Sequence, residues 1–431
     1  MQDVKPTPRE QLSRALFTLL LLLPYTLAFM LFVGKRLFRG KQQSLRDAQR
    51  LGLWLSIERK GGLLLHCVSV GEVVAATPLI KRIMLERSEL PITITTTTKT
   101  GAERVQELFG NSVQHLYLPF DLPFLMRRLM RQVDPQKVLI MEVELWPNLV
   151  HTCWERHIPI FVINARMTTK SMLRYRKLNT LVSPILNHLS GICAQGQRDF
   201  DNYLALGAPT DRLFLTNNIK FDLPKVPREP LYREFRTKFD MNGRQVLIAG
   251  STHDPEEKIL LQAFKRLKAK FPTLLLILVP RHPQRFETVG KLVESESLRL
   301  IKVSENQPCA ENTDVLLADQ MGLLNQLYAT ADIAFVGGSL AERGGHNALE
   351  PAVFGVPVLM GPSRHNNPQI CQLLAETGAL QLVENEQHLV EKAGRWLADG
   401  HKAHEAGNAG RQMILSSTGA IDATLERIFA Q

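Results

Sequence analysis

Short apolar runs rich in β-branched residues alternate with amphipathic helical patterns along most of this 431-residue chain. Alternation of this kind predicts parallel sheets that are covered by helices on both faces. Residues 220–230 (KFDLPKVPREP) interrupt it with three prolines and mixed charges, which is typical of a linker. We therefore predict two doubly wound α/β domains that face each other across a cleft. The strand-like runs are 63–69, 91–98, 113–119, 137–144, 158–164 and 191–195 before the linker, and 245–250, 273–280, 298–303, 314–318, 333–337, 357–360 and 379–383 after it.

An uncharged run of 20 residues, 15–34, precedes the alternating part. As a helix it would extend over about 30 Å, the thickness of the hydrocarbon core of a bilayer. A cleaved signal peptide would have a shorter apolar region, so an uncleaved membrane anchor is favoured. Pro24 is expected to kink the helix, which leaves open whether it spans the bilayer or only enters it. The positive-inside rule places the large carboxy-terminal part in the cytoplasm, because five basic residues and no acidic ones lie just after the anchor helix: Lys35, Arg36, Arg39, Lys41 and Arg46.

The amino-acid composition does not choose between several classes of partner. Lys and Arg outnumber Asp and Glu by 52 to 42, which suits nucleic acid, an anionic membrane surface or an anionic substrate. The five cysteines are scattered and show no spacing typical of zinc ligands, so we expect free thiols in a reducing compartment.

In doubly wound folds ligands bind beyond the carboxyl ends of the strands, so the residues that follow each strand are the candidates for chemistry. Residues 66–72 (HCVSVGE) follow the first strand-like run. Ser69 ends the run, Gly71 permits a tight turn, and Glu72 opens a helix. The Glu72 carboxylate could take a proton from an attacking hydroxyl. Alternatively, it only complements the dipole of its helix.

A second pair of carboxylates lies in residues 141–149 (MEVELWPNL). Glu142 and Glu144 alternate at the end of an apolar strand, so we expect them on opposite faces, with one of them available to sugar hydroxyls. Which one faces the cleft stays open. Lys220, at the end of the first domain, is either a partner for a carboxylate or phosphate or a charge at the hinge.

The second domain offers a candidate phosphate site in residues 250–257 (GSTHDPEE). Asp254 as N-cap and Glu257 as its partner predict a capping box at the start of a helix. Ser251, Thr252 and His253 then form a loop at the amino end of that helix, where backbone N–H groups and hydroxyls receive phosphate.

Two further motifs follow strands of the second domain. In PRHP, residues 280–283, Arg281 can neutralise a phosphate and His282 can do likewise or bind a base. Residues 337–351 (GGSLAERGGHNALEP) combine four glycines with many polar groups, which a mobile surface loop would not need. We select Gly338, Ser339, Asn347 and Glu350. Glu350 is expected just before a short helix that Pro351 opens, where it could chelate ribose hydroxyls.

Taken in order, HCVSVGE, MEVELWPNL, NNIKFD, GSTHDPEE, PRHP and GGSLAERGGHNALEP resemble the motif series of the 3-deoxy-D-manno-octulosonic acid (Kdo) transferase family. The resemblance extends from residue 66 to residue 351 and includes the anchor that precedes it. Small departures are Cys67, Ala348 and Asn217, the last at a position where glycine is common. None of them removes a polar group among the candidates.

The resemblance implies a GT-B fold and an inverting transferase that needs no metal and no cofactor. It implies CMP-Kdo as donor, a tetraacylated lipid A precursor as acceptor, inner-membrane lipid as a partner, and no nucleic acid. The implied domains are an anchor at 1–48, an acceptor domain at 49–222 and a nucleotide-sugar domain at 223–431. The resemblance implies Glu72 as the general base and, as CMP-Kdo ligands, Ser251, Thr252, His253, Arg281, His282, Gly338, Ser339, Asn347 and Glu350. From their positions after the strands and beside the cleft, we select as acceptor or cleft residues Ser69, Gly71, Glu142, Glu144 and Lys220.

Three other functions are compatible with parts of the pattern. Another lipid-linked GT-B glycosyltransferase would share the fold and use a different nucleotide sugar. A nucleotide-sugar epimerase also has two such domains, but it would not need an anchor. A membrane-tethered anion-binding scaffold would not need the many polar groups of the glycine-rich motif.

Overall fold

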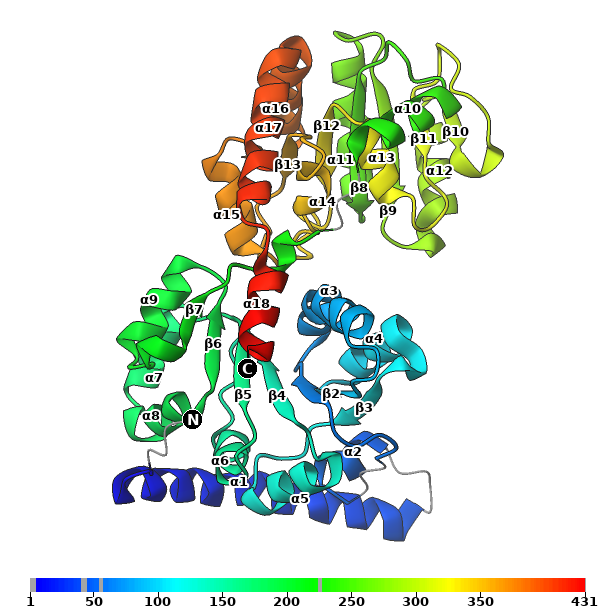
Figure 1. Cartoon of the computed structure of the whole chain (residues 1–431). Coiled ribbons are helices and arrows are strands. Elements are labelled where there is room, and N and C mark those ends of the chain that lie inside the picture. Colours follow the sequence, from blue (N-terminus) through cyan, green and yellow to red (C-terminus); the bar gives the residue numbers. More distant parts are fainter. Residues whose placement is uncertain (1–4, 40–44, 54–56, 224–226, 431) are drawn as a thin grey trace. The chain divides into compact units, whose positions relative to one another are not determined.

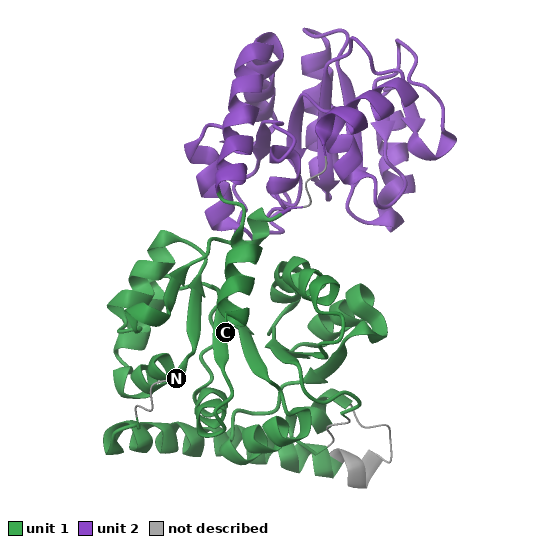
Figure 2. Ribbon diagram, in the orientation of Figure 1, with its two compact units in different colours: residues 1–222, 417–431 green, residues 223–416 purple. Residues whose placement is uncertain are grey.

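The computed structural model describes residues 5–39, 45–53, 57–223 and 227–430. The chain forms two compact units, coloured separately in Figure 2. Unit 1 contains the chain up to Asp222 together with the residues from Ser417 onward, and unit 2 contains Leu223–Ser416. The two sheets described below confirm the prediction of two doubly wound α/β domains.

Unit 1 is built on a parallel sheet of seven strands in the order β3-β2-β1-β4-β5-β6-β7 (Figure 1). This order is that of a Rossmann fold with one strand added at the edge. The side chains of each inner strand alternate between two apolar cores. Leu64 and Val138 point into one core, whereas Leu63 and Leu139 point into the other. The strands are β1 (Leu63–His66), β2 (Ile92–Thr96), β3 (Gln114–Tyr117), β4 (Lys137–Met141), β5 (Ile160–Ala165), β6 (Gly191–Ala194) and β7 (Leu213–Leu215).

Helices cover both faces of this sheet, as the continuous apolar strands require. Apart from α1 and α18, they are α2 (Leu45–Arg50), α3 (Val70–Glu86), α4 (Lys99–Phe109), α5 (Pro123–Val133), α6 (Pro147–Glu155), α7 (Thr169–Arg176), α8 (Asn179–His188) and α9 (Gln197–Ala205), with the short 3-10 helices η1 (Gly110–Ser112), η2 (Thr210–Arg212) and η3 (Ile219–Phe221).

Unit 2 repeats the architecture with a second parallel sheet of seven strands, in the order β10-β11-β9-β8-β12-β13-β14. Its strands are β8 (Val246–Thr252), β9 (Leu275–Pro280), β10 (Leu300–Lys302), β11 (Val315–Leu317), β12 (Ile333–Val336), β13 (Val358–Met360) and β14 (Leu380–Leu382). Its helices are α10 (Arg228–Lys238), α11 (Glu256–Lys268), α12 (Phe286–Ser295), α13 (Leu324–Thr330), α14 (Leu349–Ala352), α15 (Pro368–Glu376), α16 (Glu386–Ala398) and α17 (Gly400–Ser416), with η4 (Pro283–Arg285) and η5 (Val303–Glu305).

The last helix, α18 (Ala420–Phe429), corrects the predicted second domain, which was expected to extend to residue 431. Ala420, Leu425 and Ile428 are buried in the unit 1 core that also contains Leu63. The Asp222 carboxylate accepts the N–H groups at the start of α18, and the Lys137 ammonium donates to the Ile428 carbonyl at 2.8 Å. Apolar burial and these bonds at both ends hold α18 on unit 1.

The amino-terminal helix α1 runs unbroken from Pro8 to Arg39 and includes Pro24. Within the described residues it is the one helix whose length and composition would allow it to cross a membrane, over Pro8–Gly34, with a mean hydropathy of 2.4 in an 18-residue window. In Figure 1 it lies alongside α5 and α6 of unit 1, and it contacts α6 and α8.

Candidate active site

Glu72 lies in the first turn of α3, directly beyond the carboxyl end of β1. Its carboxylate accepts the backbone N–H of Val68 at 2.7 Å and the hydroxyl of Ser69 at 3.4 Å. Ser69 is the N-cap of α3 with extended backbone, and Gly71 already belongs to the helix without a left-handed conformation. The tight turn expected at Gly71 is therefore wrong, because the chain enters the helix directly from Ser69.

The surroundings of Glu72 favour its protonated form. Burial, helped by the negative charges of Glu142 and Glu144, raises the pKa of Glu72 to about 7, although the bonds from Val68 and Ser69 oppose the shift. Burial thus outweighs the helix amino terminus, which by itself would make the carboxylate less basic. A carboxyl group that titrates near neutral pH is suited to act as a general base.

Glu142 and Glu144 lie beyond the end of β4, the strand that pairs with β1. The prediction that they alternate on a strand is wrong. β4 ends at Met141, and Glu142 adopts a left-handed conformation with φ of 58°, which breaks the two-residue period. Both carboxylates act on the pKa of Glu72, and burial raises the pKa of Glu144. The structure therefore gathers three carboxyl groups at one edge of the unit 1 sheet.

Lys220 lies in η3, a segment of unit 1 that contacts α3. Its backbone N–H donates to the side chain of Asn218 at 3.0 Å. The nearby Asn217 has a φ of 65°, a left-handed conformation that asparagine tolerates better than most residues. Asn217 can therefore stand where glycine would otherwise be needed.

The second group of candidates lies at the carboxyl ends of β8, β9 and β12 in unit 2. The expected loop at 250–253 is shorter than predicted, because β8 continues to Thr252. The expected capping box is absent: α11 begins at Glu256 with no side-chain cap, and the Glu257 carboxylate instead pairs with the guanidinium of Arg285 at 2.5 and 3.1 Å. Thr252 is fully buried, and its hydroxyl has no hydrogen-bond partner within the described residues.

Glu256 is a residue that the sequence reasoning missed. Its buried carboxylate accepts the backbone N–H of His253 at 3.0 Å and those of four successive residues, 338–341, at 2.8 to 3.3 Å. The glycine-rich loop is thereby fixed to the start of α11. A Cβ at Gly337 would lie 2.4 Å from the Ser251 carbonyl oxygen, so this glycine is required for the close approach of the glycine-rich loop to the end of β8. The only sequence signal was an acidic residue in the first turn of a helix.

Three histidines gather around this junction. The Nε2 atoms of His253 and His346 are 2.9 Å apart and their rings are stacked, while the ring of His282 lies edge-on to His253 at 5.3 Å. Burial, the neighbouring His253 and the Arg281 charge lower the pKa of His346 to about 4. Burial and the charge of His282 lower the pKa of His253. Imidazole and guanidinium donors gathered in this way suit an anion. His346 belongs to a predicted motif but had been given no role.

The remaining predicted residues of unit 2 differ in whether their side chains already have hydrogen-bond partners within the protein. The Ser339 hydroxyl donates to the Val336 carbonyl at 2.6 Å and accepts the N–H of Gly361 at 2.8 Å, so it holds the loop together. Asn347 donates to the Glu350 carboxylate at 3.4 Å. Glu350 lies within α14, which begins at Leu349 and not at Pro351 as expected. Burial raises the pKa of Glu350, whereas the bond from Asn347 and the Arg281 charge lower it.

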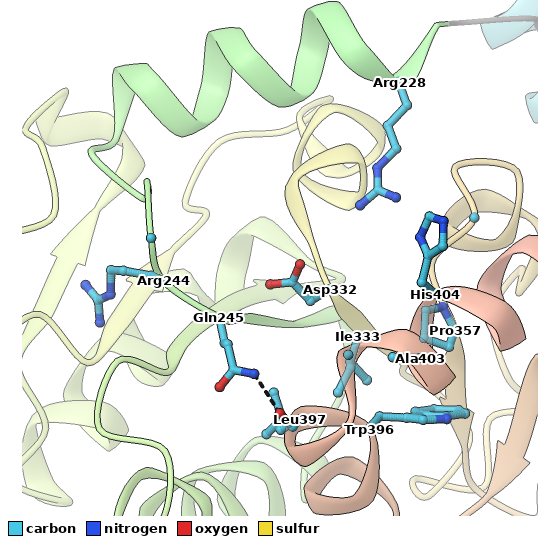
Figure 3. Close-up of a pocket in the computed structure, with 13 residues that line it drawn as sticks. Arg228, Arg244, Gln245, Asp332, Ile333, Pro357, Trp396, Leu397, Ala403 and His404 are labelled. Atoms are coloured by element: carbon cyan, nitrogen blue, oxygen red, sulfur yellow. Dashed lines mark hydrogen bonds between the residues drawn. The ribbon is translucent and has the colours of Figure 1, made fainter.

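A separate cavity of about 280 Å³ in unit 2 lies at the amino ends of the strands, opposite to the carboxyl ends that carry the candidate residues (Figure 3). It is lined by residues at the amino ends of β8 and β12, such as Gln245 and Ile333. The guanidinium of Arg228 beside it already donates to three backbone carbonyls. Since ligands of such sheets bind at the carboxyl ends, we do not include this cavity in the candidate site. Within the described ranges, no three His, Cys, Asp or Glu side chains gather so as to hold a metal ion.

Comparison with known proteins links this geometry to a family. Residues 43–223 match the family model described as 3-deoxy-D-manno-octulosonic-acid transferase (kdotransferase), and residues 243–413 match the model of glycosyl transferases group 1. The chain is 40% identical over 419 residues to the 3-deoxy-D-manno-octulosonic acid transferase of Haemophilus influenzae, covering 96% of this chain and 97% of the relative. The chain belongs to the Kdo transferase family. The Kdo transferase of Bordetella pertussis is 31% identical over 373 residues, covering 84% of this chain and 86% of the relative.

Solved structures support the fold of this Kdo transferase. UDP-GlcNAc 2-epimerase from Neisseria meningitidis matches with a TM-score of 0.56 at 15% identity, covering 86% of this chain and all of that chain. MurG from Acinetobacter baumannii matches with a TM-score of 0.55 at 14% identity and the same coverage. At such low identity these likenesses concern the fold alone, which is of the GT-B type expected from the motifs.

Proposed function

We propose that this Kdo transferase moves Kdo from CMP-Kdo to a tetraacylated lipid A precursor, with inversion and without a metal, at the cytoplasmic face of the inner membrane. Unit 1 binds the acceptor and unit 2 binds the donor. The observation that carries the proposal is the division of chemistry between the units. Carboxylates gather around Glu72 in unit 1, whereas imidazole and guanidinium donors gather around His253 in unit 2.

In the proposed reaction Glu72 takes the proton from the attacking hydroxyl of the acceptor. The hydroxyl oxygen forms a bond to the anomeric carbon of Kdo, and the bond from that carbon to the phosphate oxygen breaks. CMP leaves with the electron pair of the broken bond. Glu142 and Glu144 support the basicity of Glu72 by raising its pKa. Ser69, Gly71 and Lys220 line the acceptor side.

The leaving CMP gains negative charge on its phosphate, which is stabilised best by donors that are already in position. Arg281, His253 and His282 supply those donors in our proposal, and Glu350 binds the ribose. Ser251, Thr252, Gly338, Ser339 and Asn347 shape the loops around the nucleotide. Two of these, Gly338 and Ser339, are held by Glu256, which supports a donor site that is formed before the donor binds.

A transfer assay in detergent with EDTA tests the proposal. Purified protein is offered CMP-Kdo or UDP-GlcNAc together with the tetraacylated acceptor, and products are weighed by mass spectrometry. Product from CMP-Kdo alone would support the donor, the acceptor and the independence from metal together. Absence of product, combined with no CMP binding by calorimetry, would overturn the assignment of donor and site.

A further inference from the structure

A stripe of large apolar side chains is exposed along one side of α1. Leu20 is 69% exposed and Leu23 is 71% exposed, which is unusual for leucines of a folded unit. The spacing of three, four and seven residues places the stripe on one face of the helix. Its members are Leu12, Leu16, Leu19, Leu20, Leu23, Leu27, Met30 and Leu31.

The other side of α1 is docked on unit 1 along its length. Near its start, Ser13 donates to Thr180 at 2.8 Å and Arg14 donates to Asn148 at 3.2 Å. Near its middle, the ring of Tyr25 lies edge-on to that of Phe120 at 5.8 Å. Farther on, Phe32 is only 8% exposed and packs with Ala48 and Leu51. Residues 13 to 32 extend over about 28 Å of helix, so the contact is as long as a bilayer core is thick.

This docking is incompatible with a helix that crosses the bilayer. If α1 crossed it while docked, the helices beside it would enter the hydrocarbon. The start of α6 would enter too, with the polar network in which the Asp121 carboxylate accepts the Asn148 N–H at 2.9 Å. Loops of unit 1 that became exposed to lipid would leave backbone N–H and C=O groups unpaired, which the hydrocarbon does not tolerate. A helix with one docked face and one exposed apolar face fits the boundary between headgroups and acyl chains.

The distribution of charge along the chain indicates that the exposed apolar face of α1 contacts anionic lipid. Residues 1–222 and 417–431 contain 30 Lys and Arg against 20 Asp and Glu, whereas residues 223–416 contain 22 of each. The whole excess of positive charge therefore belongs to unit 1. Arg174, Arg176 and Lys177 are exposed just before α8, close in the chain to Thr180, which bonds to α1. Basic side chains on the unit that carries the apolar stripe match an anionic leaflet.

We propose that α1 lies in the plane of a single leaflet of an anionic bilayer and does not cross it. The proposal rests on the membrane location given under Proposed function, but not on the identity of donor or acceptor. Asn148, which α1 contacts, follows the loop that carries Glu142 and Glu144 by four residues. The acceptor edge of the unit 1 sheet therefore adjoins the helix that lies in the leaflet. A lipid acceptor reaches this edge with its acyl chains still in the membrane.

Depth measurements on the full-length protein in vesicles of phosphatidylethanolamine and phosphatidylglycerol test this geometry. Leu16→Cys, Leu23→Cys and Met30→Cys place single labels on the stripe, seven residues apart. The five native cysteines are all buried, so labelled wild type gives the background. Each fluorophore is quenched by lipids that carry spin labels at shallow or deep acyl positions.

For an in-plane helix we expect the same depth at all three positions, within one leaflet. A spanning helix would place residue 23 deeper than residues 16 and 30 by about 10 Å, since seven residues rise by about that distance. That outcome would overturn the proposal. Absence of quenching at all three positions would overturn it as well, and would also contradict the membrane location.

A matched control is Leu85→Cys on α3, whose side chain is 81% exposed. Helix α3 packs on the core of unit 1 that lies across the sheet from the core that packs against α1. The label at residue 85 should remain unquenched. Circular dichroism checks the fold of each variant. If one of them fails to fold, the nearest position of the stripe replaces it: Leu12→Cys for residue 16, Leu20→Cys for residue 23 and Leu31→Cys for residue 30. One label then still lies near the middle of the helix and one toward each end.

Discussion

The carboxylate of Glu72 accepts the backbone N–H of Val68 at 2.7 Å, which ties the candidate base to the segment between β1 and α3. The bond holds the carboxylate at the carboxyl edge of the sheet, and burial there makes it titrate near neutral pH. Position and basicity of Glu72 thus have separate causes, so they can be tested separately.

Glu72→Gln should lower the transfer rate by about 100-fold or more, the usual contribution of a general base. The glutamine keeps an oxygen that accepts the Val68 N–H, so the local structure should persist. Initial rates with CMP-Kdo measure the loss of transfer. Calorimetry measures the affinity for CMP, which should not change. Glu103→Gln on the exposed surface of α4 is the control and should retain full activity. Turnover close to that of wild type in Glu72→Gln would refute the base assignment.

The pH profile of kcat/KM should rise with pH to a plateau, with a midpoint near 7, because only the ionised carboxylate can accept a proton. Glu142→Gln removes a negative charge that raises the pKa of Glu72, so the midpoint should move to lower pH. A purely structural role for Glu142 would change the plateau and leave the midpoint in place. The profile is measured from pH 5 to 9 on both proteins.

Glu72→Gln should also stabilise the protein at alkaline pH. The folded pKa of about 7 lies above the ordinary value of 4.5, so between these values the folded state binds more protons than the unfolded state. Stability therefore falls as pH rises through this window. At pH 8 we expect the variant to gain about 1–2 kcal/mol, a value reduced from the full shift because the side chain is partly exposed. Urea unfolding at pH 8 and pH 4 measures the difference, and an equal gain at both pH values would argue against the titration of Glu72.

Glu256→Gln should loosen the glycine-rich loop. In the wild-type protein the backbone N–H groups share the two carboxylate oxygens of Glu256, whereas the amide of glutamine has only one oxygen that accepts. Each buried N–H group left unpaired costs about 1–3 kcal/mol of stability. We expect CMP affinity to fall at least tenfold by calorimetry, with no change in the binding of acceptor to unit 1. Lys258→Gln on the exposed surface of the same helix is the control. Unchanged CMP affinity in Glu256→Gln would mean that the loop does not contribute to donor binding.

Ile428→Ala should destabilise unit 1 although the residue lies almost at the end of the chain. Its side chain is fully buried, and such truncations cost about 2–5 kcal/mol. Hydrogen exchange of the β1 and β4 amides in urea measures the effect. Leu204→Ala on α9, which is half-exposed, should change stability by less than about 0.5 kcal/mol. Equal protection in the two variants would contradict the packing of α18 on unit 1.

The sequence predicted the two sheets and the strands that carry the candidate residues, because alternation and apolar runs are local signals. It did not predict where α18 belongs, since the pattern of Ala420, Leu425 and Ile428 shows an apolar face but not which sheet it covers. Glu256 was missed because its partners in the glycine-rich loop are more than 80 residues away. The prediction that Glu142 and Glu144 alternate on a strand was wrong because one residue, Glu142, has a left-handed conformation and ends the two-residue repeat.

The return of α18 to unit 1 has a consequence for synthesis on the ribosome. Every strand of the unit 1 sheet has been made by residue 215, but the helix that covers part of one core is made only after the 194 residues of unit 2. At about 5–20 residues per second, that apolar surface around Leu63 and Ile219 stays uncovered for about 10–40 s in the nascent chain. The amino-terminal unit is thus the first to be translated and the last to be completed.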